Sequence, residues 1–411
     1  MLVRLMDGTG IDSFSSRAAR PAAAAWPWLL ACYAAGVLAA AQIGKFAALA
    51  PPMVRELGLG LPTMAVLIAL IEAGGSLLGV RAGRAAQRVG LVRAMVGALL
   101  LLAVASFGES HANGAVALVA WRLVEAMGYV GVIVSAPVLI AQGAGPRLAP
   151  ILLTVWSTFV PVGLAVGAWG HGAAADASGW RAATQGSAVA ALLLALASVA
   201  AYRGGGDRLP RAMGTPASAD AAPDGAMAPA AWYLAAAFGG FATLGIGVLA
   251  LLPTVLANHG LGVADAGRWT AWASFATVPG SLFVAFVVQR PAWHRPLVTF
   301  ALLLPALLMF VVFGVSVPAA TVAVAALAMN AALGIFGGLA FALLPQVAGR
   351  PHRTAQAYGA LAQFGASGSL AGPPLMAAVA AHAGWGAAAG LGFVLALVSW
   401  PLALLALRRT G

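Results

Sequence analysis

The chain has 411 residues, of which 62% are hydrophobic and only 8% are charged, and its mean hydropathy is +0.94. A soluble globular protein carries roughly 25% charged residues, so this composition excludes a soluble protein. The formal charge of +11 comes from basic residues that stand singly or in pairs between apolar runs, which excludes the basic, aromatic surface typical of a nucleic-acid-binding protein.

Twelve apolar runs follow one another along the chain, and each is long enough to cross a hydrocarbon layer of roughly 30 Å. The first run is too long for the core of a cleaved signal peptide. The expected helices cover residues 21–50, 62–82, 91–108, 113–142, 150–170, 181–202, 230–256, 267–289, 296–315, 319–345, 354–380 and 386–407. The sequence therefore predicts an all-α membrane protein with twelve transmembrane helices.

Basic residues indicate the orientation, because short cytoplasmic loops are enriched in Lys and Arg. If the N-terminus is cytoplasmic, 17 of the 22 basic residues lie in the tail and the even-numbered loops. Only Arg55, Arg181 and Arg268 lie in the outer loops, and the remaining two, Lys45 and Arg122, fall within expected spans. Both termini are then expected in the cytoplasm. Lys45 is the only lysine, and all other basic residues are arginines. This excess of arginine fits a GC-rich coding bias and favours a bacterial protein, for which a multi-pass helical chain is expected in the inner membrane.

A linker divides the chain. Residues 204–229 are rich in Gly, Pro, Ala and Asp and show no apolar periodicity, which is typical of a flexible linker. We therefore predict a cytoplasmic tail over 1–25, a six-helix bundle over 26–203, the cytoplasmic linker over 204–229 and a second six-helix bundle over 230–411.

The two halves contain an internal repeat. A shift of 202 residues places Gly58 on Gly260, and a shift of 205 residues places Gly179 on Gly384. Further matches are Pro51 with Pro253, Phe159 with Phe364, Gly163 with Gly368, Gly167 with Gly372 and Trp180 with Trp385. Because six is an even number, both copies keep the same orientation, as in the parallel repeats of many transporters.

Glycines at intervals of four mark two expected helix faces. Gly75, Gly79 and Gly83 lie on the second helix, and Gly163 and Gly167 lie on the fifth. Such faces allow helix backbones to approach closely. These glycine faces either allow tight packing of helices or form a surface along which the two halves slide during rocking.

Four charged residues stand out because they lie well inside the expected spans, where a charge costs at least a few kcal/mol and therefore indicates a functional site. They are Lys45, Glu72, Arg122 and Glu125. In one interpretation Arg122 pairs with Glu125 and Lys45 with Glu72, which only orders the bundle or couples its motions. In the other, Lys45 and Arg122 bind an anionic substrate while Glu72 or Glu125 carries a proton.

The C-terminal half offers no matching charged residue away from the ends of its expected spans. Its polar contribution would come from Asn330 and Gln363, with Tyr129 and Trp156 of the other half as walls of a substrate site. The alternative for each of these four side chains is a hydrogen bond or packing contact between helices.

No motif of an enzyme is present: the chain lacks His-Glu-x-x-His, Gly-x-Ser-x-Gly and a phosphate-binding Gly-Lys-Ser/Thr loop. The six histidines, among them His171 and His294, fall in or near expected loops and are predicted to be solvated. The single cysteine, Cys32, excludes a disulfide or cysteine metal site within one chain. We therefore expect no enzyme, no metal and no cofactor, and an ion gradient as the energy source.

The loop between the second and third expected helices, GRAAQRVGLVR, resembles the G-x-L-A-D-R-x-G-R-K signature of the major facilitator superfamily. The matching residues are Gly83, Ala86, Arg88 and Gly90. Gln87 occupies the acidic position, and Arg93 alone remains of the basic pair. Arg122 resembles the buried helix 4 arginine of that family. The resemblance implies the family's fold of two pseudo-symmetric six-helix bundles, with the loop acting in the conformational change.

Shorter patches resemble the bacterial branch of cyanate and nitroimidazole transporters, namely Gln42-Ile-Gly44-Lys45, Pro51-Pro52-Met53, Gln363-Phe-Gly365 and Gly372-Pro373-Pro374. The family resemblance implies a secondary active transporter that works by alternating access. Lys45 and Arg122 inside the expected spans, with Glu72 or Glu125 as proton carrier, favour a small organic or inorganic anion moved with proton symport. Alternatives are a proton-coupled drug or cation exporter that uses Glu72 or Glu125, and a non-transporting membrane receptor or scaffold. We expect a monomer whose partners are a small-molecule substrate, protons and membrane lipid.

Overall fold

The computed structural model describes residues 26–204, 227–314, 316–350 and 353–409, and every regular element in these ranges is a helix. The helices of the first half are α1 (Trp26–Leu57), α2 (Leu61–Ala69), α3 (Ile71–Val89), α4 (Leu91–Ser110), α5 (Ala115–Trp156) and α6 (Phe159–Gly204). Those of the second half are α7 (Pro229–Asn258), α8 (Val263–Phe275), α9 (Thr277–Val287), α10 (Pro291–Val312), α11 (Ala319–Val347), α12 (Thr354–Ala383) and α13 (Trp385–Ala406), followed by a 3₁₀ turn η5 (Leu407–Arg409). The expected tail and residues 205–226 of the expected linker lie outside the described residues.

Ten helical segments of the described chain are long and apolar enough to cross a membrane. Two of them, α5 and α6, have 42 and 46 residues, whereas about 20 residues suffice for one crossing. The backbone leaves the helical region at Gly145 in α5 and at Gly179 in α6. Divided there, α5 and α6 form three spans, and α12, which packs between α3 and α7, completes the predicted twelve.

Glycines in a left-handed backbone conformation mark equivalent turns in the two halves. Their φ angles are 64° at Gly58 and 88° at Gly260, 70° at Gly145 and 82° at Gly349, and 83° at both Gly179 and Gly384. A residue with a β-carbon rarely adopts such angles. The recurrence of these turns at shifts of 202 to 205 residues confirms the predicted repeat.

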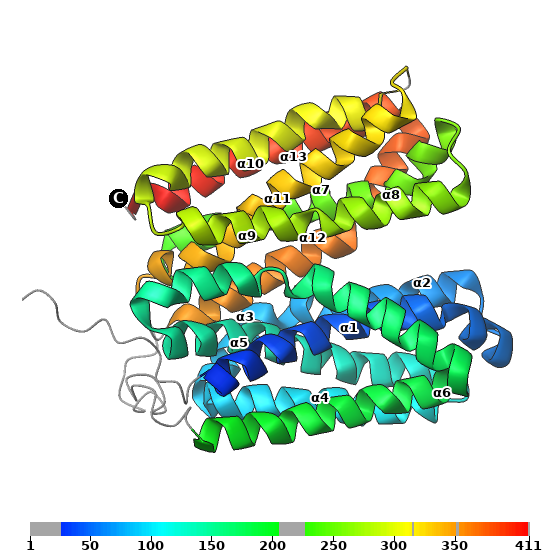
Figure 1. Cartoon of the computed structure of the whole chain (residues 1–411), viewed down its shortest axis with the longest axis vertical. Helices are drawn as coiled ribbons and strands as arrows, with labels where there is room; N and C mark the ends of the chain where they lie inside the picture. Colours follow the sequence, from blue (N-terminus) through cyan, green and yellow to red (C-terminus); the bar gives the residue numbers. More distant parts are fainter. Residues whose placement is uncertain (1–25, 205–226, 315, 351–352, 410–411) are drawn as a thin grey trace, which may run out of the picture.

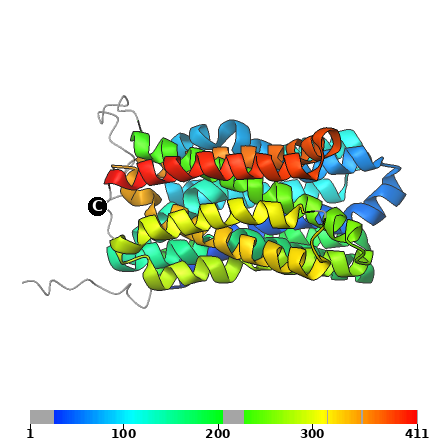
Figure 2. The ribbon, with the colours of Figure 1, turned by 90° about the horizontal axis from the view of Figure 1, so that it is seen from above.

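The two halves lie side by side, with α1 to α6 in the lower part of Figure 1 and α7 to α13 in the upper part. The helix axes are roughly aligned with one another through the molecule, as the view from above also shows (Figure 2). We call the end at which α6 ends and α7 begins the linker end. The junction of α3 with α4 and the C-terminal end of α13 lie at this same end.

Bare glycine faces join α3 to α12 across the two halves. A β-carbon on Gly79 would lie 2.8 Å from Cβ of Gln363 and would collide with the carbonyl oxygen of Gly359. The backbone nitrogen of Val80 donates a hydrogen bond to Oε1 of Gln363 at 3.1 Å. The predicted close packing is therefore found, and on this helix it joins the halves.

The other glycine stripe packs within the first half. A β-carbon on Gly163 would lie 2.5 Å from the carbonyl oxygen of Val37 on α1. In the second half, Gly368 meets the backbone of Thr243 on α7 in the same way, with the nitrogen at 2.9 Å from such a β-carbon. Equivalent glycines thus pack against equivalent helices in the two copies.

The linker end has further contacts between the halves. Nε2 of Gln289 donates a hydrogen bond to the carbonyl oxygen of Arg147 at 3.0 Å. Deeper in the molecule, the rings of Phe159 and Phe341 pack edge to face with their centroids 6.3 Å apart. Together with the α3 and α12 contact, these interactions hold the halves together on the linker side.

Candidate functional site

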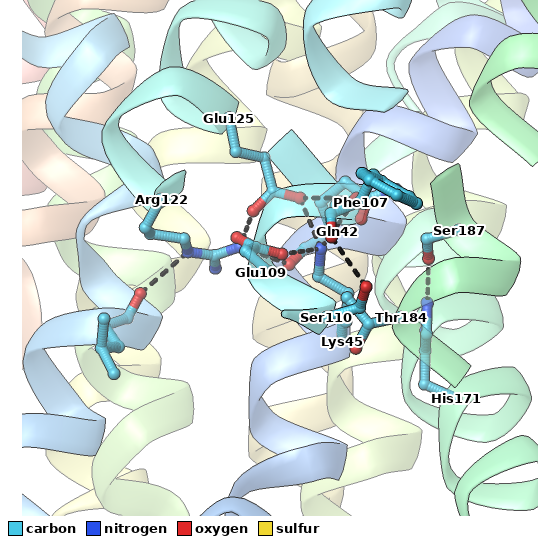
Figure 3. A network of polar contacts seen from close by, with 12 residues as sticks. Gln42, Lys45, Phe107, Glu109, Ser110, Arg122, Glu125, His171, Thr184 and Ser187 are labelled. Atoms are coloured by element: carbon cyan, nitrogen blue, oxygen red, sulfur yellow. Dashed lines mark hydrogen bonds and ion pairs between the residues drawn. The ribbon is translucent and has the colours of Figure 1, made fainter. Parts of the chain in front are cut away.

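Four charged side chains meet inside the half formed by α1 to α6, and Figure 3 shows them from close by. Lys45 comes from α1, Glu109 from the end of α4, and Arg122 and Glu125 from α5. All four side chains are fully buried. We call these residues the buried charge network. Two cations and two anions are enclosed together, which offsets much of the cost of removing each from water.

Glu125 lies at the centre of the buried charge network. Its Oε1 accepts a hydrogen bond from Nζ of Lys45 at 2.6 Å, and its Oε2 accepts one from Nη1 of Arg122. Arg122 and Glu125 are three residues apart, so α5 presents both on one face. Each oxygen of this carboxylate is therefore engaged by a different cation.

Arg122 also binds backbone carbonyls of two neighbouring helices. Its Nε donates to the oxygen of Leu67 at 2.9 Å, its Nη1 to that of Gln42 at 3.0 Å, and its Nη2 to that of Ile68 at 3.4 Å. Leu67 and Ile68 lie in the last turn of α2, where carbonyls lack partners within the helix. The guanidinium carbon also lies 4.1 Å from the centre of the Phe46 ring. Arg122 thus ties α1, α2 and α5 together.

Lys45 has an acceptor for each of its three N–H donors. Nζ lies 2.5 Å from Oε2 of Glu109, 2.6 Å from Oε1 of Glu125 and 3.1 Å from Oγ of Ser106. The second oxygen of Glu109, Oε1, is buried and has no hydrogen-bond partner within the described residues. The carboxyl groups of Glu109 and Glu125 also interact directly. Glu109 is therefore the incompletely bonded member of the buried charge network.

The expected pair of Arg122 with Glu125 is present, whereas the expected pair of Lys45 with Glu72 is wrong, because Lys45 binds Glu109 and Glu125 instead. Glu72 is half-buried on α3 and forms no hydrogen bond or ion pair with another described residue. It interacts electrostatically with Arg122 and with Tyr129. It therefore lies beside the network without belonging to it.

Glu109 is the functional candidate that the sequence analysis missed. The third expected span ended at residue 108, whereas α4 continues to Ser110. The turn signal that follows, with Asn113 and Gly114, indicates where the helix could have been extended. Ser106 and Glu109, three residues apart, then share the helix face that meets Lys45.

Of the other expected substrate residues, Tyr129 is buried on α5 and interacts electrostatically with Glu72, which lies beside the buried charge network. Trp156 is fully buried, stacks on Phe159 with centroids 4.7 Å apart, and has no hydrogen-bond partner for Nε1 among the described residues. Asn330 is buried and donates to the carbonyl oxygen of Ala326 in its own helix at 2.9 Å. Oε1 of Gln363 accepts the hydrogen bond from the backbone nitrogen of Val80 on α3.

The loop motif lies at the linker end, between α3 and α4. Gly83 is buried against Ala355 at the start of α12. Gly90 has φ of 96° and separates the two helices, while Arg88 and Arg93 are exposed and Gln87 is half-buried. The motif thus borders the contact between the two halves.

Three described histidines differ from the expectation that all are solvated. His259, just after the end of α7, is half-buried and its Nε2 lies 2.9 Å from the carbonyl oxygen of Gly314. His294 is buried and its Nε2 lies 2.7 Å from the carbonyl oxygen of Val288. His171 is half-buried within α6, and its Nε2 lies 2.5 Å from Oγ of Ser187. For His171 and His294 the reason is that α6 and α10 extend beyond the expected spans, which places these two rings among neighbouring helices.

Comparisons with known protein families and proteins identify the family of this chain. The model of the Major Facilitator Superfamily matches residues 32–373. A search of curated protein sequences found no match.

Two solved structures share the fold of this chain. The human organic anion transporter MFSD10 (TETRAN) has a TM-score of 0.69 at 17% identity, covering 92% of this chain and 99% of that chain. The proton:xylose symporter XylE, bound to 6-bromo-6-deoxy-D-glucose, has a TM-score of 0.67 at 16% identity, covering 92% and 96%. Because the family match spans well over half of the residues, this multi-pass membrane chain belongs to the major facilitator superfamily and is a secondary transporter, not an enzyme.

Proposed function

We propose that the protein is a proton-coupled symporter of a small organic or inorganic anion, in which Glu109 carries the proton. The observation that supports this proposal is the incomplete bonding of Glu109. Glu125 is bonded to both cations, whereas Glu109 is bonded to only one of the two, Lys45, and keeps one buried oxygen without a hydrogen-bond partner among the described residues. A proton on that oxygen also relieves the repulsion between two neighbouring carboxylates.

Proton uptake at Glu109 makes Lys45 available to the substrate. A neutral Glu109 holds the ammonium less strongly, so one N–H of Lys45 can turn to an anion that enters when the halves rock. The proton and the anion together leave the net charge of the network unchanged. The unfavourable burial of an unpaired ammonium is thereby avoided, and this requirement couples the two ligands.

The rest of the transport cycle is assigned to the remaining expected residues. Arg122 keeps the helices in place, and Tyr129, Trp156, Asn330 and Gln363 contact the substrate. The motif formed by Gly83, Gln87, Arg88, Gly90 and Arg93 acts in the conformational change.

We further propose a setting for this transport. The chain is a monomer in a bacterial inner membrane, with membrane lipid around it, and it acts within the cyanate and nitroimidazole branch. The linker end and both termini are cytoplasmic, and the functional units are the bundles over 26–203 and 230–411, flanked by the tail 1–25 and joined by the linker 204–229.

A specific observation favours a second candidate, proton-coupled export of drugs or other cations. Glu72 is half-buried and free of ion pairs in the described part of the chain, so its carboxylate can accept an organic cation. Together with Glu72, the buried charge network contains three acidic and two basic residues, an excess of acid that suits a cation.

Thermal stabilisation of the purified protein discriminates between the two candidates, because a ligand that binds only the folded state raises the melting temperature. We expect small carboxylates or cyanate-like anions to stabilise the protein, more strongly at low pH because proton and anion bind together. Stabilisation by lipophilic cations alone, stronger at high pH, would replace symport by export. A protein that moves neither solute class in proteoliposomes would be a receptor or scaffold.

Replacing Glu109 by Gln tests the proposed proton site. The amide imitates the protonated carboxyl, so we expect anion binding to persist, its pH dependence to disappear, and a pH gradient to stop driving anion accumulation. Melting curves at two pH values and proteoliposome uptake measure these effects. Glu56 is exposed at the end of α1 that lies away from the linker end, and the control variant Glu56→Gln should keep the pH dependence of anion binding and the uptake driven by a pH gradient. Wild-type pH dependence in Glu109→Gln would exclude Glu109 as the proton carrier.

A further inference from the structure

A groove with a volume of about 660 Å³ lies on the outside of the second half, between α10 and α13. It is lined by Arg295, Pro296, Thr299, Phe300, Leu404 and Arg408. α10 begins and α13 ends at the linker end (Figure 1). The groove is therefore separate from the buried charge network, which lies inside the other half.

The charge of the groove is positive. Arg295 and Arg408 come from different helices, both are exposed, and neither forms a salt bridge with another described residue. No acidic residue belongs to the lining. A guanidinium group presents a planar fork of donors that matches the oxygens of a phosphate. Two such groups around one groove favour an anion that carries phosphate.

The lining of the groove also contains a polar group that suits the same ligand. Oγ1 of Thr299 accepts a hydrogen bond from Nε1 of Trp400 at 3.0 Å. This bond occupies the oxygen as acceptor and leaves the hydroxyl hydrogen free to donate to a third oxygen of a phosphate group.

The remaining wall is apolar and exposed. Phe300 is 51% exposed, and Pro296 and Leu404 continue the surface beside it. Because Arg295 lies only four residues into α10, about 6 Å along its axis, we expect it at the level of the lipid headgroups, with Phe300 one to two turns deeper. The 49% exposed Trp293 is typical of a membrane interface at this level.

We propose that this groove binds an anionic phospholipid. Its phosphate lies between Arg295 and Arg408 with a hydrogen bond from Thr299, and one acyl chain lies along Phe300 and Leu404. Basic pockets between transmembrane helices at a membrane surface bind anionic headgroups in this manner. Free phosphate would leave the exposed apolar wall uncovered, so the groove fits a lipid better than a soluble anion.

The test compares lipids and variants in the full-length protein. Binding of phosphatidylglycerol and phosphatidylcholine is measured by native mass spectrometry, and melting temperatures are measured with each lipid and with inorganic phosphate. Arginines near an anionic surface contribute about fivefold each to binding. We therefore expect Arg295→Ala/Arg408→Ala to weaken phosphatidylglycerol binding about 25-fold. The matched control is Arg84→Ala/Arg203→Ala, two exposed arginines of the first half, and it should bind as the wild type does.

Further variants separate the possible outcomes. Phe300→Ser keeps both arginines but removes the apolar contact, so weaker lipid binding with unchanged melting in detergent supports a lipid over free phosphate. Equal binding of the two lipids, or equal losses in the paired variant and its control, would overturn the proposal. Stabilisation by inorganic phosphate as strong as that by phosphatidylglycerol, with Phe300→Ser unaffected, would assign the groove to a soluble anion instead.

Discussion

Replacing Glu125 by Gln lowers the free energy of unfolding by about 3–5 kcal/mol, the range expected when one partner of a buried ion pair is removed. Glu125 accepts from both Lys45 and Arg122, and all three side chains are fully buried. The amide removes the negative charge, so Glu109 alone must balance two cations. An uncompensated charge in a medium of low dielectric constant accounts for the large effect.

Thermal and chemical denaturation of the detergent-purified protein measure this change. The matched control is Glu56→Gln, because Glu56 pairs with Arg181 at 2.8 Å but is 49% exposed. An exposed pair contributes about 0–1 kcal/mol, so the control should melt close to the wild type. Similar small effects in both variants would mean that the buried charge network does not support the folded state.

Replacing Gly79 by Val opens the linker end. The new β-carbon would lie 2.8 Å from Cβ and 2.9 Å from the backbone nitrogen of Gln363. Packed interiors do not absorb such overlap without shifting, and overpacking costs about 1–3 kcal/mol. Because α3 and α12 belong to different halves, separation of the halves relieves the overlap. This energy corresponds to a roughly 5- to 150-fold shift of the conformational equilibrium.

Spin labels at Arg84 on α3 and at Arg350, two exposed positions near the α3 and α12 contact, report the separation. The single native cysteine, Cys32, is buried, so engineered cysteines can be labelled selectively. We expect longer distances and slower transport in Gly79→Val. Gly97→Val is the control, because a β-carbon on Gly97 meets nothing within 4 Å. An unchanged distance distribution in Gly79→Val would show that the contact does not keep the linker end closed.

The membrane spans could be predicted from the sequence because they depend on properties that are local along the chain. A span requires an apolar run of sufficient length, and the lack of hydrogen-bonding partners in lipid forces that run into a helix. The turns are local as well: glycine permits the left-handed backbone at Gly58, Gly179 and their partners in the second half. The same reasoning predicted the pair of Arg122 with Glu125, whose spacing on one helix brings them together.

Contacts between different helices required the tertiary structure. The sequence shows that Lys45, Glu72, Arg122 and Glu125 are ionisable and lie in apolar runs, but the choice of partner depends on how each helix is rotated and which helices are neighbours. The structure brings Glu109 rather than Glu72 to Lys45. The expected helix end at residue 108 falls two residues short of Ser110, and this small error left Glu109 outside the expected span.

The glycine stripes illustrate the same division. Their spacing of four residues establishes a bare helix face, because this spacing returns to the same side of a helix. It does not specify the partner: Gly163 packs on α1 within one half, and Gly79 packs on α12 across the two halves. The sequence by itself thus determined the spans, their number and their turns, whereas only the tertiary structure decided which faces and charges meet, because helix rotation and neighbourhood arise from packing of the whole chain.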